Sequence, residues 1–372
     1  MATHGSTRWS VPVAATPLSP GGRCGTLHTS NRPSSRSVAC RPEHAPSCSR
    51  RSQPVNSPGP TREEVQLEVY RKVVTIRFAE LRIREHVEAE GFGGFWHPGI
   101  GQEGLQVGAV SAMQPDDYLY YAHRGLGYAF AKGMELELLF GDLLGRRTGS
   151  TRGKGGGTVH FADASRQVLG QGGTLGSSFV MGAGTAAASQ LLGDGRVTVV
   201  FFGDGASGRG TWHEAALQAS VWKLPVVWIC ENNGWALSAR FTEQSPTEHV
   251  ADRAPAYGMP GVVVDGQDAM AVREVTLEAI DRARRGEGPT LIEAKTLRIR
   301  GHYEGDRQPY RDDPVLGDEI PNDPVHRLGE TIPDDVRREI DAEARTRVEQ
   351  AFDAALAAPR ADDSVIFEDV WA

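Results

Sequence analysis

Hydrophobic residues recur at helical spacing just after residue 60. Five apolar side chains form this stripe: Val65, Val69, Val73, Ile76 and Leu81. Their spacing, mostly three or four residues, places them on one face of a helix. Thr61 precedes the stripe, and Glu64 stands three residues after Thr61, which is the pattern of a capping box. The sequence therefore predicts a helix that begins at Thr61.

Further along, short β-branched runs alternate with helical stretches. The clearest runs are Arg196–Phe202 and Pro225–Cys230, and one helical stretch separates them. A crossover that holds one helix joins parallel strands of one sheet. A charge-rich helical region is expected at about Pro333–Ala358, before a short apolar segment at 365–367. The alternation predicts an α/β fold, with an open, mostly parallel sheet covered by helices on both faces.

Residues 1–60 differ in composition from the rest of the chain. They are rich in Ser, Pro, Arg and Gly, and Glu43 is their only acidic residue. We expect a disordered tail at 1–60 and one folded domain at 61–372. The tail is interpreted either as an organelle transit peptide or as a plain disordered extension. The extension is preferred because no amphipathic helix is evident, and it places the protein in the cytoplasm rather than in an organelle.

Charge and cysteine content exclude several classes of protein. The net charge of −8 gives no electrostatic basis for binding nucleic acid or an anionic membrane surface. No apolar run reaches the roughly 18–20 residues that span a bilayer. Cys24, Cys40 and Cys48 lie in the tail, and only Cys230 lies in the body. We therefore expect an intracellular protein without structural disulfides.

A glycine-rich turn, G-D-G-A-S-G at 203–208, follows the first buried run. Asp204 stands at the end of this strand, and Asn233 stands at the end of the next one. The carboxyl ends of parallel strands meet at one edge of the sheet, and adjacent strands are about 4.8 Å apart. A carboxylate and an amide oxygen at that edge suit Mg²⁺, with a backbone carbonyl near Trp235 as a third ligand.

The same turn also matches the G-x-G-x-x-G fingerprint of dinucleotide-binding enzymes. Glu231 lies further on, where an acidic residue would bind a ribose. The carboxylate of Asp204 opposes this interpretation because it would repel a pyrophosphate. Taken singly, Asp204 and Asn233 could also serve only an Asx turn and a loop cap. A nicotinamide-dependent dehydrogenase therefore remains an alternative.

G-D-G followed by N-N is the thiamine diphosphate motif, and four further stretches accompany it here. In chain order they are GFWHPGIGQEG at 94–104, AHRGLGYAFAKG at 122–133, GRRTGSTRGKGGGTVH at 145–160 and IRGHYEGDRQPYR at 299–311. Together they resemble the alpha subunit of the thiamine diphosphate-dependent decarboxylating component of 2-oxo acid dehydrogenase complexes. The resemblance runs from about residue 70 to residue 327.

The resemblance implies which residues hold the metal and the diphosphate. Asp204 and Asn233, with the carbonyl of Trp235, would bind Mg²⁺. Gly205 and Ala206 would present backbone groups to the diphosphate of the cofactor.

The resemblance also implies contacts with the rest of the cofactor. Arg124 would bind the diphosphate as a fixed fork of donors, and the neighbouring His123 would contact the cofactor. Gly173 and Leu175 would support the aminopyrimidine and hold the cofactor bent. From the residues alone, Arg124 could instead pair with an acid, and Leu175 could belong to the core.

Two histidines would be catalytic by the same resemblance. His97 would lie near the substrate, and His302 would lie on a loop beside the cofactor. Imidazole suits proton transfer because its ordinary pKa is about 6.5. The alternative for both is a solvated loop histidine.

The implied reaction is the oxidative decarboxylation of a 2-oxo acid, with transfer of the acyl group to the lipoyl group of a partner acyltransferase. Pyruvate is the first expected substrate, acetoin is the second, and a branched-chain 2-oxo acid is a further alternative. Ylid formation needs a carboxylate, and the body has room for only one domain. The resemblance implies that a beta subunit supplies this glutamate in an α₂β₂ heterotetramer.

Two positions depart from the family's pattern. His123 stands where a tyrosine is common, and Leu126 stands where the family has a later histidine. Leu126 removes a polar group near the cofactor. These departures keep open an inactive paralogue that serves only as a scaffold.

Overall fold

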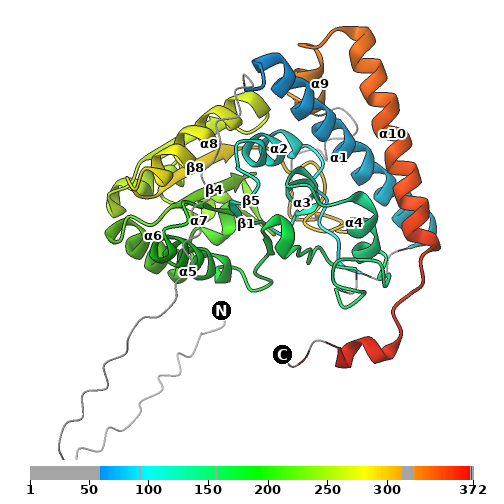
Figure 1. Cartoon of the computed structure of the whole chain (residues 1–372), viewed down its shortest axis with the longest axis horizontal. Coiled ribbons are helices and arrows are strands. Elements are labelled where there is room, and N and C mark those ends of the chain that lie inside the picture. Colours follow the sequence, from blue (N-terminus) through cyan, green and yellow to red (C-terminus); the bar gives the residue numbers. More distant parts are fainter. Residues whose placement is uncertain are drawn as a thin grey trace, which may run out of the picture. The chain divides into compact units, whose positions relative to one another are not determined.

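The computed structural model describes residues 59–91, 94–155, 157–311, 320, 322–368 and 370 (Figure 1). The expected disordered tail and its three cysteines lie outside these residues, apart from the last two positions of the tail. The part from Gly59 onward forms one compact unit. Cys230 is a buried free thiol in this unit.

The first helix, α1 (Arg62–Glu90), begins where the sequence predicts. The Thr61 hydroxyl accepts the N–H of Glu64 at 3.2 Å, and the Glu64 carboxylate accepts the N–H of Thr61 at 2.7 Å. Val69, Val73 and Ile76 of the predicted stripe are buried. The capping box and the apolar face together fix this helix.

Six parallel strands form the central sheet, in the order β2-β1-β3-β4-β8-β7. Their bounds are β1 Tyr118–Tyr120, β2 Val168–Gly170, β3 Thr198–Gly203, β4 Val226–Asn232, β7 Gly261–Asp265 and β8 Thr290–Lys295. The two strands expected to be parallel neighbours are β3 and β4, which pair from Thr198↔Val226 to Gly203↔Glu231. A separate two-stranded hairpin, β5 (Trp235–Ala236) and β6 (Ala239–Arg240), follows β4.

Helices cover both faces of the sheet, as predicted (Figure 1). On one face α5 (Ser177–Leu192) and α6 (Gly210–Val221) pack against alternate strand residues such as Phe202 and Trp228. On the other face α2 (Glu103–Ser111) and α8 (Ala269–Arg284) pack against Phe201 and Ile229. Successive residues of a strand point to opposite sides of the sheet. Because helices bury both sides, the strand sequences are apolar throughout.

The predicted charge-rich helix is α10 (Asp334–Ala357), which packs against α1 (Figure 1). The apolar segment after it forms the short 3₁₀ helix η4 (Asp363–Phe367). The remaining helices are α3 Leu126–Ala131, α4 Leu136–Leu143, α7 Phe241–Gln244, α9 Pro324–Gly329, η1 Ala164–Arg166, η2 Asp204–Ala206 and η3 Ala251–Tyr257.

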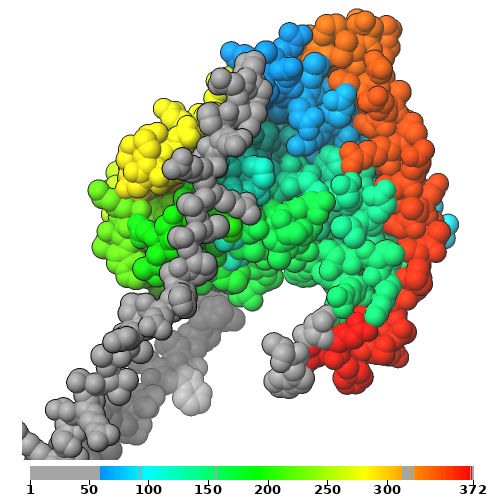
Figure 2. Space-filling view, in the orientation of Figure 1, coloured from blue at the N-terminus to red at the C-terminus, as the bar shows by residue number. Residues whose placement is uncertain are grey.

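The C-terminal turn (red in Figure 2) lies against the segment that follows α4, where Arg147 donates to Glu368 at 2.6 Å. Within the described ranges, no helix combines the length and the apolarity needed to cross a membrane.

Candidate active site

The carboxyl ends of β3 and β4 bring Asp204 and Asn233 together. Asp204 is the first residue after β3 and is 3% exposed, and Asn233 is the first residue after β4. The backbone N–H of Asn233 donates to the Asp204 carboxylate. The Asn233 amide oxygen accepts the N–H of Trp235 at 3.1 Å, which holds the side chain at the start of β5. The carboxylate of Asp204 therefore lies beside the backbone of Asn233, at the ends of two neighbouring strands.

One oxygen of Asp204 is free to bind a cation. Its Oδ2 atom is buried and finds no hydrogen-bond partner among the residues described. Burial raises the pKa of this carboxyl to about 6, and hydrogen bonds from backbone N–H groups oppose the rise only in part. An unpaired buried carboxylate oxygen and an amide oxygen from the next strand end are both ligands that Mg²⁺ accepts. These residues therefore fit the predicted metal.

The turn after β3 is packed closely against the β5 hairpin. A Cβ atom at Gly205 would lie 2.4 Å from the Cβ of Ala236, so no larger residue fits without displacement of the hairpin. Ala206 is buried as well. Glycine at 205 thus keeps the backbone of the turn next to the residues that follow β4.

Three histidines meet at the same end of the sheet. His97 precedes α2, His123 lies between β1 and α3, and His302 lies in the segment after β8. The ring centroid of His97 is 4.6 Å from those of both His123 and His302. The Nδ1 atom of His97 lies 2.6 Å from the carbonyl oxygen of His302. The two predicted catalytic histidines are therefore in direct contact, and His123 completes the cluster.

All three imidazoles are held in the neutral form. Burial lowers the pKa of His97 to about 4, and the nearby Arg124 guanidinium lowers it further. Burial, followed by His97 and Arg124, lowers the pKa of His302 to about 3. Burial and Arg124 also hold the pKa of His123 well below its ordinary value. Neutral imidazoles with pKa values this low are weak bases at neutral pH and carry no imidazolium proton to donate, so proton transfer by His97 and His302 stays a prediction.

Arg124 lies next to the histidine cluster and is 2% exposed. Its guanidinium donates to the carbonyl oxygen of Pro98 at 2.6 Å and to that of His302 at 3.3 Å. Burial lowers its pKa to about 10, and the carboxylate of Glu231 opposes this. Two of its donors are thus used to hold loop backbone, and the predicted contact with a diphosphate stays a prediction.

Gly173 and Leu175 lie on the loop between β2 and α5. Leu175 is 52% exposed, although a leucine at this point of the sequence would ordinarily be taken for a core residue. The Nε atom of Arg209, just beyond the glycine turn, donates to the carbonyl oxygen of Leu175 at 3.1 Å. A Cβ atom at Gly173 would meet only the ring of His160, at 3.6 Å. The structure therefore links this loop to the Asp204 turn and leaves the Leu175 side chain open to a ligand.

Arg298 is a site residue that the sequence analysis missed. It donates to the carbonyl oxygen of Leu237 at 2.7 Å and to the hydroxyl of Tyr310 at 3.0 Å. Its charge acts on both Asp204 and His302. The signal that could have found it is its position just after β8, the strand that pairs with β4.

Glu231 does not support the dinucleotide alternative. Its side chain is 2% exposed, and Gln106 donates to it at 3.4 Å. Burial raises its pKa to about 7 against the effect of Arg124. A carboxylate enclosed in this way cannot bind a ribose at the surface of the sheet.

Leu126, which with His123 departs from the family's pattern, is a buried core residue at the start of α3.

Comparison with known proteins agrees with this geometry. The profile of the family described as "Dehydrogenase E1 component" matches residues 71–363. The acetoin:2,6-dichlorophenolindophenol oxidoreductase alpha subunit of Bacillus subtilis is 42% identical over 249 residues, which cover 67% of this chain and 74% of that protein. The Cupriavidus necator protein of the same name is 38% identical, over 84% of this chain and 96% of its own length. The pyruvate dehydrogenase E1 component alpha subunit of Zymomonas mobilis is 33% identical, over 83% and 89%.

The match covers more than half of the chain, and the fold and the paired strand ends agree with it. The chain therefore belongs to the dehydrogenase E1 component family, as an alpha subunit of the thiamine diphosphate-dependent 2-oxo acid dehydrogenase type.

Proposed function

We propose that this chain binds thiamine diphosphate through Mg²⁺ and, together with a beta subunit, oxidatively decarboxylates pyruvate. The observation that carries the proposal is the buried, unpaired Oδ2 atom of Asp204 next to Asn233. A buried carboxylate oxygen without a partner is costly unless a ligand pairs with it. Mg²⁺ held by Asp204, Asn233 and the Trp235 carbonyl would supply that partner and attract the diphosphate.

Other residues of this edge would hold the rest of the cofactor. Gly205 and Ala206 would present backbone groups to the diphosphate, with Arg124 behind them. Gly173 and the exposed side chain of Leu175 would support the aminopyrimidine. When bound, thiamine diphosphate supplies a nucleophilic carbon and an electron sink for the reaction. His97, His123 and His302 would surround the reacting groups, and His97 and His302 would transfer protons.

The substrate is the finer part of the proposal. Pyruvate and acetoin both contain an acetyl unit, and they differ in the group attached to it. Acetoin is the second candidate, and it is supported by the two relatives named for acetoin, which are 42% and 38% identical to this chain; the pyruvate relative of Zymomonas mobilis is 33% identical. A branched-chain 2-oxo acid is the third candidate.

Two partners follow from this function. The described histidine cluster contains three imidazoles and no carboxylate, whereas formation of the reactive carbon needs one. We propose that a beta subunit supplies a glutamate in an α₂β₂ heterotetramer, with the cofactor at the subunit interface. The acyl group would then pass to the lipoyl group of an acyltransferase. The location in the cytoplasm stays a prediction.

The decisive experiment reconstitutes the chain with its beta subunit and assays pyruvate, acetoin and branched-chain 2-oxo acids side by side. Reduction of a lipoyl acceptor is the readout. We expect turnover with pyruvate that needs thiamine diphosphate, Mg²⁺ and both subunits. Turnover of acetoin alone would move the substrate to the second candidate.

Two outcomes would overturn the proposal more deeply. Full activity of the chain without a beta subunit would refute the shared site. Absence of cofactor binding in the reconstituted assembly would favour the scaffolding paralogue. The nicotinamide alternative is tested separately, because NAD binding would survive chelation of Mg²⁺ and thiamine diphosphate binding would not.

A further inference from the structure

The histidine cluster has the geometry of a metal site distinct from the oxygen site at Asp204. One potential ligand nitrogen from each of His97, His123 and His302 lies within 4.8 Å of the other two. The three residues come from segments that are far apart in the chain, so tertiary packing alone assembles them. No carboxylate belongs to this described group.

The hydrogen bonds leave nitrogen lone pairs available. Nδ1 of His97 is bound to the carbonyl oxygen of His302 at 2.6 Å. In a neutral ring this makes Nδ1 the donor and leaves Nε2 as the nitrogen with a lone pair. Nε2 of His123 is buried and meets no partner in the described part of the chain.

This arrangement is typical of metal-ligating histidines. Such residues usually donate their second ring N–H to a carbonyl or a carboxylate, which fixes the tautomer, and His97 does so.

We propose that His97, His123 and His302 together bind one divalent transition-metal ion of the Zn²⁺ class through three imidazole nitrogens, with a fourth position open. Imidazole ligands select Zn²⁺, Ni²⁺, Cu²⁺ or Co²⁺ rather than Mg²⁺, which prefers oxygen. Zn–N bonds of about 2.0–2.1 Å place ligand nitrogens about 3.4 Å apart, so small ring rotations close the cluster around the ion.

Neighbouring charges set the strength of this site. Arg124 and Arg298 face the cluster and repel a dication, while Asp306, which accepts the backbone N–H of His302 at 2.8 Å, partly offsets them. We therefore expect weaker binding than at a structural zinc site. The bound ion would occupy the nitrogens of His97 and His302 and so inhibit turnover reversibly. This inhibition rests on the proposed function, whereas the binding does not.

The test uses the purified full chain with Mg²⁺ present and without thiamine diphosphate. Co²⁺ is titrated with visible absorption as the readout, and Zn²⁺ is titrated by calorimetry. We expect one ion per chain and a ligand-field spectrum of low coordination number with nitrogen ligands. His123→Asn should weaken binding of both ions by about 10-fold to 100-fold, while His326→Asn should not, because His326 is an exposed residue of α9.

Two further variants separate the possible failures. Asp204→Asn should weaken Mg²⁺-dependent cofactor binding about 100-fold and leave the Co²⁺ spectrum unchanged, which keeps this site apart from the proposed function. If circular dichroism shows that His123→Asn does not fold, His302→Asn replaces it, because His302 is only partly buried. Stoichiometric binding that survives loss of the histidine, or no binding of either ion, would refute the site.

Discussion

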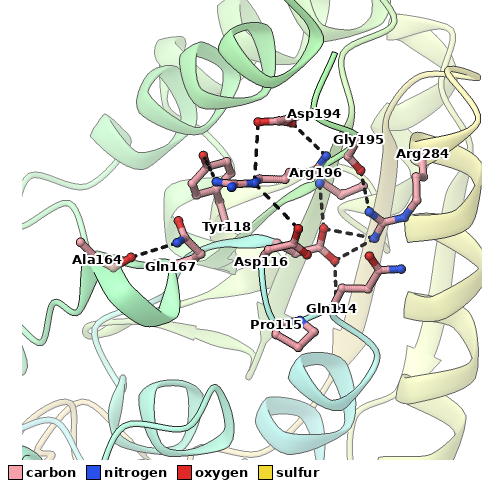
Figure 3. Close-up of polar contacts among 12 residues, drawn as sticks. Gln114, Pro115, Asp116, Tyr118, Ala164, Gln167, Asp194, Gly195, Arg196 and Arg284 are labelled. Atoms are coloured by element: carbon pink, nitrogen blue, oxygen red, sulfur yellow. Dashed lines mark hydrogen bonds and ion pairs between the residues drawn. The ribbon is translucent and has the colours of Figure 1, made fainter. Parts of the chain in front are cut away.

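The amino ends and the carboxyl ends of the sheet strands, which we call the amino edge and the carboxyl edge, differ in how completely the buried carboxylates of Asp117 and Asp204 are paired. At the amino edge, Asp117 accepts the N–H groups of Gln114 and Val197, both at 2.8 Å, and two hydrogen bonds from Arg284 at 2.9 and 3.1 Å. Figure 3 shows Arg284 and Arg196 converging on this edge beside Asp116 and Asp194. At the carboxyl edge, Asp204 Oδ2 and His123 Nε2 are buried and have no partner within the described residues.

This difference separates stability from function. The Asp117 carboxylate accepts four hydrogen bonds, so its charge is paired within the folded protein itself. A buried polar atom without a partner costs free energy of folding. A ligand cation would pair the free oxygen of Asp204, whereas Asp117 is already paired, so the contrast between the two carboxylates favours the carboxyl edge as the binding edge.

The largest effect is expected from Asp117→Ala at the paired edge. The substitution removes the carboxylate partner of the Arg284 guanidinium, whose side chain is only 23% exposed, and leaves it the hydrogen bond to the carbonyl oxygen of Gly195. We expect a loss of about 3 kcal/mol in the free energy of unfolding, measured by urea denaturation. Asp116→Ala is the control: its carboxylate is 56% exposed and lies 3.9 Å from Arg196, so the loss should be under about 0.5 kcal/mol. Equal losses in the two variants would contradict the comparison.

The opposite result is expected from Asp204→Asn at the unpaired edge. Thiamine diphosphate affinity in the presence of Mg²⁺ should fall about 100-fold, or about 2.8 kcal/mol, because the metal loses its charged ligand. The free energy of unfolding should not fall, since a buried carboxylate is removed. Calorimetric titration of the assembly with its beta subunit measures the affinity. Asp194→Asn, at the amino edge, should leave it unchanged; an unaffected affinity in Asp204→Asn would place the metal elsewhere.

A pH series tests a second unpaired carboxyl near the binding edge. Burial raises the pKa of Glu80 to about 8, although the N–H of Gly99 donates to it at 3.1 Å. The folded state therefore keeps a proton that the unfolded state releases, so stability is lost as the pH rises from about 4.5 through about 8. The slope should reach at most about 1.4 kcal/mol per pH unit.

Glu80→Gln should remove this part of the pH dependence in urea unfolding at a series of pH values. Glu63→Gln, in the exposed first turn of α1, serves as the control and should keep the wild-type slope. An unchanged slope in Glu80→Gln would show that Glu80 is ionised in the folded protein.

The smallest effect is expected from Leu175→Ala. Its side chain is half exposed, so the free energy of unfolding should change by less than about 1 kcal/mol. Thiamine diphosphate affinity should fall about five-fold, which corresponds to about 1 kcal/mol of lost apolar contact. Leu191→Ala, which is 89% exposed on α5, should change neither quantity. Equal affinities in both variants would remove Leu175 from the cofactor site.

The sequence by itself determined the local elements and the placement of Asp204 and Asn233 at neighbouring strand ends. The Thr61 capping box and the stripe from Val65 predict α1, because helix ends and helix faces depend on residues three or four apart. The apolar runs that became β3 and β4 placed Asp204 and Asn233 at one edge, because parallel strands joined through one helix end on the same side.

Only the tertiary structure decided which distant side chains meet there. His97, His123 and His302 share no local pattern, and packing of three separate segments brings their rings together. Segments far apart in the chain likewise decide three other features: the effect of the Arg298 charge on Asp204, the burial of Glu231 and the exposure of Leu175. Periodicity reports the conformation of a segment, whereas side-chain contacts and pKa values depend on what the other segments place beside it.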